Sequence, residues 1–92
     1  MEKQEEAVRI IEAIGTTTLK WDYRILAYEY DGEVYFQIHQ VYYNEEGKPA
    51  GYVESPASVG SKEVKGVRRI LNKMPECLEK PILWAGKKFP NE

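Results

Sequence analysis

The stretch WDYRILAYEYDGEVYFQIHQVYY, residues 21–43, decides the fold of this chain of 92 residues. Two runs rich in Tyr, Ile, Val and Phe, residues 21–30 and 34–43, are typical of β-strands. Between them lies Asp31-Gly32, a preferred dipeptide for a two-residue hairpin turn, because both positions need a positive φ. The turn fixes the pairing of the two strands, since a slip by one residue would move every side chain to the other face.

This pairing predicts two different faces for the sheet. In the register that the turn sets, Ile25 lies opposite Ile38 and Arg24 lies opposite His39. We expect the more apolar face to form the core, and it comprises Trp21, Tyr23, Ile25, Ala27, Val34, Phe36, Ile38 and Tyr42. The opposite face, named the tyrosine face, comprises Arg24, Leu26, Tyr28, Tyr35, Gln37, His39 and, from a third strand, Tyr52.

The third strand is predicted over residues 48–53, after a turn at residues 44–47 that ends in glycine. Pro49 has no N–H donor for a neighbouring strand, so this strand is expected at an edge of the sheet. Its pairing with the hairpin brings Tyr52 next to His39 on the tyrosine face.

A first helix is predicted over residues 2–14. Ala7, Ile10, Ile11 and Ile14 fall on one apolar stripe, and the glycine that follows suits a C-terminal cap. The sequence leaves three positions open for this helix: beside the second helix, on the tyrosine face, or on a neighbouring chain.

A second helix is predicted to start from an N-cap at Ser61 and to end or kink near Pro75. We expect it to cover the apolar face of the sheet. Gly66 should weaken it by about 1 kcal/mol relative to alanine unless close packing requires a glycine. Its regular apolar stripe consists of Val64, Val67, Leu71, Met74 and Leu78, widened by Ile70.

These elements predict an α+β fold of αβββα order, with a three-stranded antiparallel sheet, a C-terminal amphipathic helix on one face and an N-terminal helix. The 92 residues are expected to form a single domain. Residues 1–15 are interpreted as an N-terminal helix added to the fold, residues 20–84 as a ββ(β)α core and residues 85–92 as a tail. Residues 81–84 are expected to be extended and to lie back on the body, and the chain from Lys87 onward is expected to fray.

Composition is that of a globular protein, with 42% hydrophobic residues, 30% charged residues and a net charge of −2. No apolar run is long enough for a membrane span and no signal peptide is evident, so a cytoplasmic location is the expectation. The charge is unevenly distributed: residues 1–60 hold five basic and eleven acidic groups, and residues 61–92 hold eight basic and four acidic ones. This asymmetry indicates either a binding surface or a basic helix packed on an acidic sheet.

Catalytic apparatus is not evident. His39 is the only histidine and Cys77 the only cysteine, and neither has a predicted partner. Phosphate-binding loops, nucleophile elbows and zinc-protease motifs do not occur. The acids Glu45 and Glu46 lack the spacing of a calcium loop. We therefore expect no enzyme activity, no cofactor and no metal.

The tyrosine face is the leading candidate for function. Rigid aromatic and arginine side chains are enriched at protein interfaces, so the face predicts contact with another protein or with a second copy, including a homodimer. The candidate contact residues are Arg24, Tyr28, Tyr35, Gln37, His39 and Tyr52. A purely structural interpretation stays open, because cross-strand aromatic pairs also stabilise a sheet.

Nucleic-acid binding is the alternative. The αβββα order is that of double-stranded RNA-binding domains, which clamp phosphates with lysines at the start of their second helix. Residues 60–65, GSKEVK, resemble a reduced form of that family's signature and lack one of its lysines. The candidate phosphate contacts are Lys62, Lys65, Arg69 and Lys73.

A longer resemblance covers about residues 21 to 84. YFQIHQVYYNEEGKP, residues 35–49, resembles the Tyr-x-Ile-His-Glu-Val-Tyr-Tyr-Asp-x-x-Gly-Lys-Pro stretch of a group of small uncharacterised bacterial proteins. GYVESP at 51–56 and EKPIL at 79–83 resemble two further stretches of that group. The resemblance implies a compact ββ(β)α unit without implying an activity. The chain departs from the group in its N-terminal helix and in the basic character of its second helix.

Overall fold

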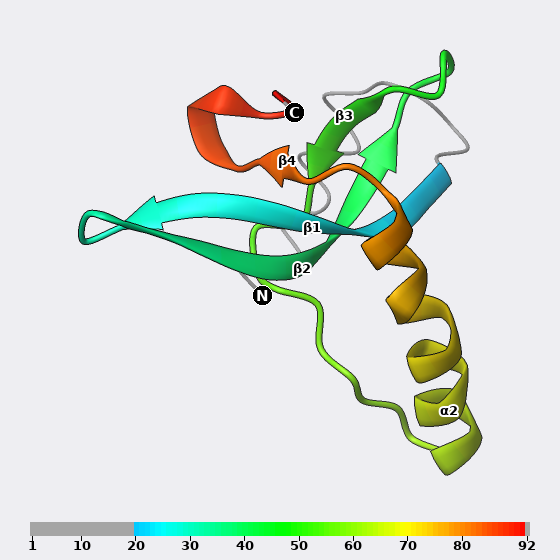
Figure 1. The fold of residues 1–92 in the computed structure, drawn as a ribbon. Helices are drawn as coiled ribbons and strands as arrows, with labels where there is room; N and C mark the ends of the chain where they lie inside the picture. Colours follow the sequence, from blue (N-terminus) through cyan, green and yellow to red (C-terminus); the bar gives the residue numbers. More distant parts are fainter. Residues whose placement is uncertain (1–19, 92) are drawn as a thin grey trace.

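The computed structural model describes residues 20–91, and the helix predicted near the N-terminus lies outside this range. The described chain is α+β and combines a curled four-stranded sheet with one α-helix (Figure 1). The strands are β1 (Lys20–Tyr30), β2 (Glu33–Tyr43), β3 (Pro49–Tyr52) and β4 (Leu83–Trp84). The helix is α2 (Val64–Lys73), and two short 3₁₀ helices, η1 (Met74–Glu79) and η2 (Gly86–Lys88), follow it.

The β1–β2 hairpin has the register predicted from its turn. Asp31 and Gly32 have φ values of 53° and 78°, the positive angles that a type I′ turn requires. Tyr30 pairs with Glu33, and the antiparallel pairing continues without a shift to Lys20 and Tyr43. Away from the turn the hairpin joins the sheet, and its turn end projects from the molecule (Figure 1).

Strand β3 lies at an edge of the sheet, as Pro49 predicts, and the strand order is β3-β2-β1-β4. The pairing of β3 with β2 shifts between Tyr42 and Tyr43. Beyond β3, the N–H groups of Val53 and Ala57 donate to carbonyl oxygens of β2, at 2.9 and 2.8 Å. The chain after β3 therefore continues along the same edge before it turns away to α2.

A fourth strand, β4, was not predicted. It runs parallel to β1 at the opposite edge of the sheet, where Leu83 pairs with Leu26. The expectation that residues 81–84 are extended and lie back on the body is confirmed. Their membership of the sheet carries no sequence signal, because two residues are too short to show an alternating pattern.

The main hydrophobic core lies on the tyrosine face, so the prediction that the other face forms the core was wrong. The fully buried centre comprises Leu26, Val41 and Leu83, and the half-buried side chains of Tyr43, Tyr52, Ala85 and Phe89 pack against it. On the expected core face, Phe36 is 58% exposed and Val34 is 47% exposed. Tyr23 and Ala27 of that face are buried as expected. The core forms where β4 and the following residues supply apolar side chains.

Residues 85–91 pack against the body of the protein, which corrects the expectation of a frayed tail from Lys87. The Phe89 and Tyr52 rings lie 4.8 Å apart between centroids. The Trp84 N–H donates to the Asn91 carbonyl at 2.9 Å. An apolar side chain and backbone hydrogen bonds thus hold this segment on the body.

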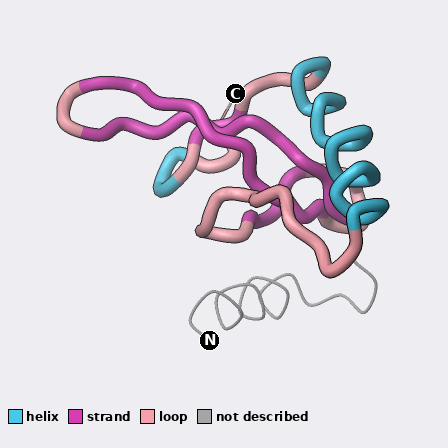
Figure 2. Tube along the Cα trace, turned by 90° about the horizontal axis from the view of Figure 1, so that it is seen from below, coloured by secondary structure: helices cyan, strands magenta, loops and turns pink. Residues whose placement is uncertain are grey.

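Helix α2 does not cover the sheet, contrary to the prediction. It projects from the body, and Figure 2 shows it on the side opposite to the turn end of the hairpin. Its C-terminal end is held by η1, which packs on β1 and buries Cys77, and by Lys73, whose Nζ lies 5.8 Å from the centre of the Trp21 ring.

The C-terminal end of α2 agrees with the sequence-based prediction, and its N-terminal end does not. The helix ends at Lys73 and continues as the 3₁₀ helix η1, which confirms the break predicted at Pro75. It begins at Val64 instead of directly after Ser61, whose hydroxyl accepts the Glu63 N–H at 3.2 Å. Gly66 is buried because it lies against Ser61, so the close packing that would justify a glycine is present.

Candidate functional site

Arg24 is an internal residue, 6% exposed, and this corrects its assignment to a contact surface. Its Nη1 donates to the Tyr43 hydroxyl at 2.9 Å and its Nη2 donates to the Pro81 carbonyl at 2.8 Å. Its Nε is buried and has no hydrogen-bond partner among residues 20–91. The carboxylate of Asp22 pairs with Lys80. Arg24 therefore ties β1 to β2 and to the segment that leads into β4.

His39 is also internal, at 4% exposure. Its Nδ1–H donates to the Val53 carbonyl at 2.8 Å, and its Nε2 lies 3.4 Å from Oε1 of Gln37, which is half-buried. Burial lowers the pKa of His39, and the hydrogen bond to the Val53 carbonyl partly opposes this effect. His39 therefore has a structural role, because it holds the chain after β3 through the Val53 carbonyl.

Tyr52 belongs to the core as well. Its ring meets the His39 ring edge to face at 5.7 Å and packs on Phe89. Its hydroxyl accepts the Gly86 N–H at 2.7 Å. The predicted neighbourhood of Tyr52 and His39 is confirmed, but His39 is buried and the C-terminal segment packs against Tyr52.

The accessible tyrosines of the tyrosine face lie at the turn end of the hairpin. The Tyr28 and Tyr35 rings stack at 5.9 Å, and the Tyr30 ring meets Tyr35 at 6.2 Å. Tyr30 and Tyr35 are exposed, and Tyr28 is half-buried. Tyr30 was not among the predicted contact residues, although the hairpin register already places it beside Tyr35. Residues 28–36 are called the hairpin end below.

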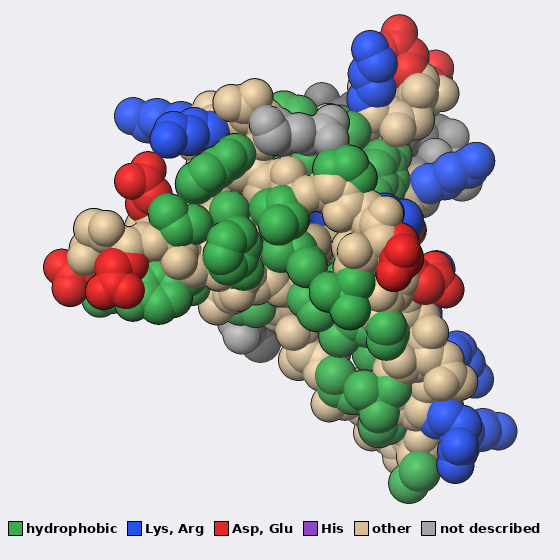
Figure 3. Space-filling view, in the orientation of Figure 1, with side chains coloured by type: hydrophobic (Ala, Val, Ile, Leu, Met, Phe, Trp, Pro, Cys, Tyr) green, Lys and Arg blue, Asp and Glu red, His purple; other side chains and the backbone are tan. Residues whose placement is uncertain are grey.

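The hairpin end is apolar on its other face and acidic at its margin. Val34 and Phe36 are exposed there, so both faces of this two-stranded ribbon present large apolar groups. Residues 28–36 contain three acids and no base. Figure 3 shows acidic side chains gathered at this end. The three acids are Glu29, Asp31 and Glu33.

Helix α2 presents the predicted basic residues to solvent. Lys62, Lys65, Arg69 and Lys73 are all exposed, and Figure 3 shows basic side chains along the outer side of α2. Of these four, Lys73 contacts an aromatic ring, that of Trp21. No ion pair to Lys62, Lys65 or Arg69 occurs within residues 20–91.

The same helix carries exposed apolar side chains. Val64 is 79% exposed and Leu71 is 53% exposed. They are seven residues apart and share a face, with Arg68 between them at helical spacing. Figure 3 shows apolar side chains running along α2 beside the basic ones.

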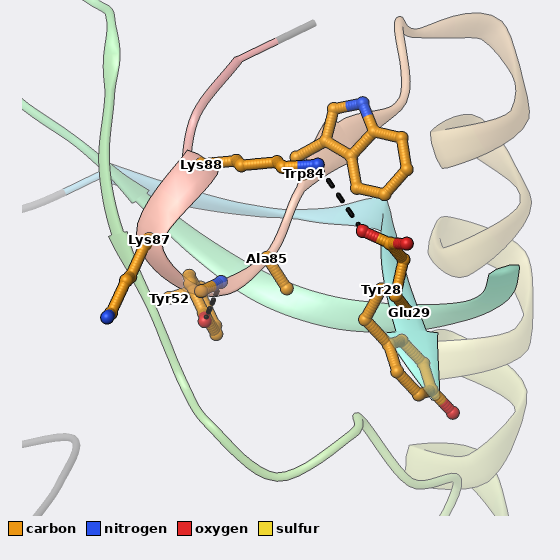
Figure 4. A pocket seen from close by; sticks show the side chains of 8 residues that line it. Tyr28, Glu29, Tyr52, Trp84, Ala85, Lys87 and Lys88 are labelled. Atoms are coloured by element: carbon orange, nitrogen blue, oxygen red, sulfur yellow. Dashed lines mark hydrogen bonds and ion pairs between the residues drawn. The ribbon is translucent and has the colours of Figure 1, made fainter. Parts of the chain in front are cut away.

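A shallow pocket of about 410 Å³ lies among the end of β1, Tyr52 of β3 and residues 84–88 (Figure 4). The Lys88 Nζ lies 4.9 Å from the centre of the Trp84 ring and 3.3 Å from Oε1 of Glu29, while Lys87 points away from both. The ammonium group of Lys88 is thus already in contact with Trp84 and Glu29. The lining residues are Tyr28, Glu29, Tyr52, Trp84, Ala85, Gly86, Lys87 and Lys88.

Other chemical groups are sparse in the described part of the chain. Cys77 is buried, and burial raises the pKa of its thiol, which disfavours the reactive thiolate. Residues 20–91 hold no cluster of three or more His, Cys, Asp or Glu side chains suited to a metal ion. Among the described helices, none has the length and apolar character needed to cross a membrane.

Comparison with known proteins adds no relative. A scan against protein-family models, a search of curated proteins and a search of solved structures each returned no match.

Proposed function

We propose that this chain is a non-catalytic protein-binding module and that the hairpin end is its contact surface. The aromatic cluster of Tyr28, Tyr30 and Tyr35, of which Tyr30 and Tyr35 are exposed, carries this proposal. Tyrosine side chains offer a large contact area with few rotatable bonds, which is why they are enriched at protein interfaces.

The shape of the hairpin end supports the same function. An isolated two-stranded ribbon is marginally stable in water, because it has no third layer to cover its apolar side chains. The base of the hairpin is held by the internal hydrogen bonds of Arg24 and His39. Its end has Phe36 and Tyr35 exposed on opposite faces. A partner that covers this end would bury apolar area on a hairpin whose base is anchored in the sheet.

The test replaces Tyr30 and Tyr35 by serine in the full chain. Sedimentation velocity of the purified wild type and variant measures self-association. Both proteins are also used to capture binding proteins from an extract of the cells that make this chain. Each captured protein is then purified and titrated against the wild type and the variant. The proposal requires at least about a tenfold loss of affinity, which is about 1.4 kcal/mol. The matched control is Val59→Ser, an exposed apolar residue on the segment between β3 and α2. A variant that is folded by circular dichroism and retains every association of the wild type contradicts the proposal.

Nucleic-acid binding is the second candidate, and the exposure of Lys62, Lys65 and Arg69 on a projecting helix favours it. Exposed apolar residues on the same helix are better suited to a protein than to a phosphate backbone, so the protein contact is preferred. The test titrates double-stranded RNA with the full chain at low salt and then raises the salt. Phosphate contacts predict an affinity that falls steeply with salt and falls further in a Lys65→Glu, Arg69→Glu variant. Undetectable binding at low salt contradicts this candidate.

A further inference from the structure

We infer that the partner of the hairpin end is α2 of a second copy of this chain, so that two copies exchange these two arms reciprocally. This inference rests on the proposed function and names its partner. The two copies form a closed two-fold dimer in which the hairpin end of each copy contacts α2 of the other.

The first observation is that both arms leave apolar side chains uncovered. Phe36 and Val34 are exposed on the hairpin end, and Val64 and Leu71 are exposed on α2. Helix α2 has ten residues, whereas isolated helices shorter than ~12–15 residues are marginal in water. Since α2 is held mainly at its C-terminal end by η1, packing along its exposed face would add to its stability.

The second observation is charge complementarity. The hairpin end holds three acids and no base, and residues 62–73 hold five bases and one acid. Contact between two hairpin ends or between two α2 helices would bring like charges together, while contact between a hairpin end and α2 brings unlike charges together. Arg68 lies between Val64 and Leu71, so a basic group borders the apolar strip that the hairpin end would cover.

The third observation is the direction of the arms. In Figures 1 and 2 the hairpin end and α2 extend to different sides of the body and do not meet. Within one copy, the hairpin end therefore does not contact α2. Two copies related by a two-fold axis satisfy both pairs at once, because each copy supplies one hairpin end and one α2.

The deciding experiment reverses the charge of each arm separately. In one full-length variant the hairpin end carries Glu29→Lys, Asp31→Asn and Glu33→Lys. In the other, α2 carries Lys65→Glu, Arg68→Glu and Arg69→Glu. Each variant alone then has two arms of like charge and should associate at least about tenfold more weakly than the wild type. An equimolar mixture restores both unlike pairs, and sedimentation velocity should show a heterodimer with an affinity within about threefold of the wild type.

Apolar variants test the same contact without changing charge. Phe36→Ser on the hairpin end and Leu71→Ser on α2 should each weaken the dimer about tenfold or more. Val59→Ser, at a similarly exposed apolar residue outside both arms, should leave it unchanged. Circular dichroism of each variant checks that a loss of association is not a loss of folding.

Three results would overturn the inference. The first is a wild type that stays monomeric up to about 100 μM, a concentration at which even weak specific dimers form. The second is a dimer that the α2 variant retains and the hairpin variant loses, which would place a hairpin against a hairpin. The third is a mixture that does not associate. If the wild type is monomeric but the Tyr30 and Tyr35 variant loses a captured protein, the proposed function stands and the second copy is excluded.

Discussion

Leu83 lies directly beside Leu26 in the parallel pairing of β4 with β1, and both side chains are fully buried. The two residues come from opposite ends of the described chain. Their contact closes the core over the face of the sheet that also holds Val41. Strand β4 therefore contributes strongly to the fold, although it has only two residues.

Leu83→Ala should reduce the free energy of unfolding by about 2–5 kcal/mol, because it removes a fully buried side chain and leaves a cavity beside Leu26. Urea unfolding of the full chain measures this loss. Ile82→Ala is the matched control, since the neighbouring Ile82 is exposed and should cost less than about 1 kcal/mol. Equal losses for the two variants would mean that β4 does not dock as described.

Gly66→Ala should destabilise the protein, although alanine is normally favoured over glycine in a helix by about 1 kcal/mol. The reason is that a side chain at Gly66 would collide with the Ser61 side chain. In a Ser61→Gly background the collision disappears, so the same Gly66→Ala change should become stabilising. Asn72→Ala, at an exposed position of α2, is the control and should act alike in both backgrounds. Additive effects of Gly66→Ala and Ser61→Gly in urea unfolding would contradict the prediction.

Acidification should weaken the protein through His39. Burial sets the pKa of folded His39 below its ordinary value of 6.5, so the unfolded chain takes up a proton at higher pH than the folded one. The contribution to stability is present above pH 6.5 and is lost as the pH falls through the pKa of the folded state. Unfolding free energies between about pH 7.5 and pH 5 measure this slope.

His39→Asn is the control for this pH dependence. The asparagine amide can still donate to the Val53 carbonyl but does not titrate. Because His39 is the only histidine of the chain, the difference in slope between wild type and variant isolates its effect. Parallel slopes in the two proteins would exclude His39 as the titrating group.

Cys77 should react slowly with a maleimide in the folded protein. Its thiol is buried and its pKa is raised, so both access and thiolate content are low. We expect labelling at least about tenfold slower than in the urea-unfolded chain, with every modification assigned to this one cysteine. A rate equal to that of the unfolded chain would show that η1 does not cover the thiol.

Local signals in the sequence were sufficient for the hairpin, the edge strand and the end of the helix. Asp31-Gly32 determines the register, Pro49 determines the edge position and Pro75 ends α2, because each acts through backbone geometry within a few residues. The choice of the core face lacked such a signal. Both faces of the hairpin carry large apolar residues, and the choice depends on where β4 and Phe89 come to lie.

The candidate site was predicted in part for the same reason. Tyr28 and Tyr35 do lie together near the accessible end of the hairpin. Arg24 and His39 were misplaced, because a polar side chain in a strand pattern is assumed to face water. Their hydrogen-bond partners, the carbonyls of Pro81 and Val53, come from irregular segments whose positions the strand pattern does not reveal.

Because β4 follows β1 and β2 in the chain, it is synthesised after them, and this order affects folding during translation. The hairpin can form within microseconds of its emergence, but the roughly forty residues that separate β2 from β4 take about 2–8 s to synthesise. During that interval the edge of β1 is unpaired and Leu26 is without its neighbour, Leu83. Each nascent copy thus passes through a stage in which an open strand edge is available to chaperones or to other nascent chains.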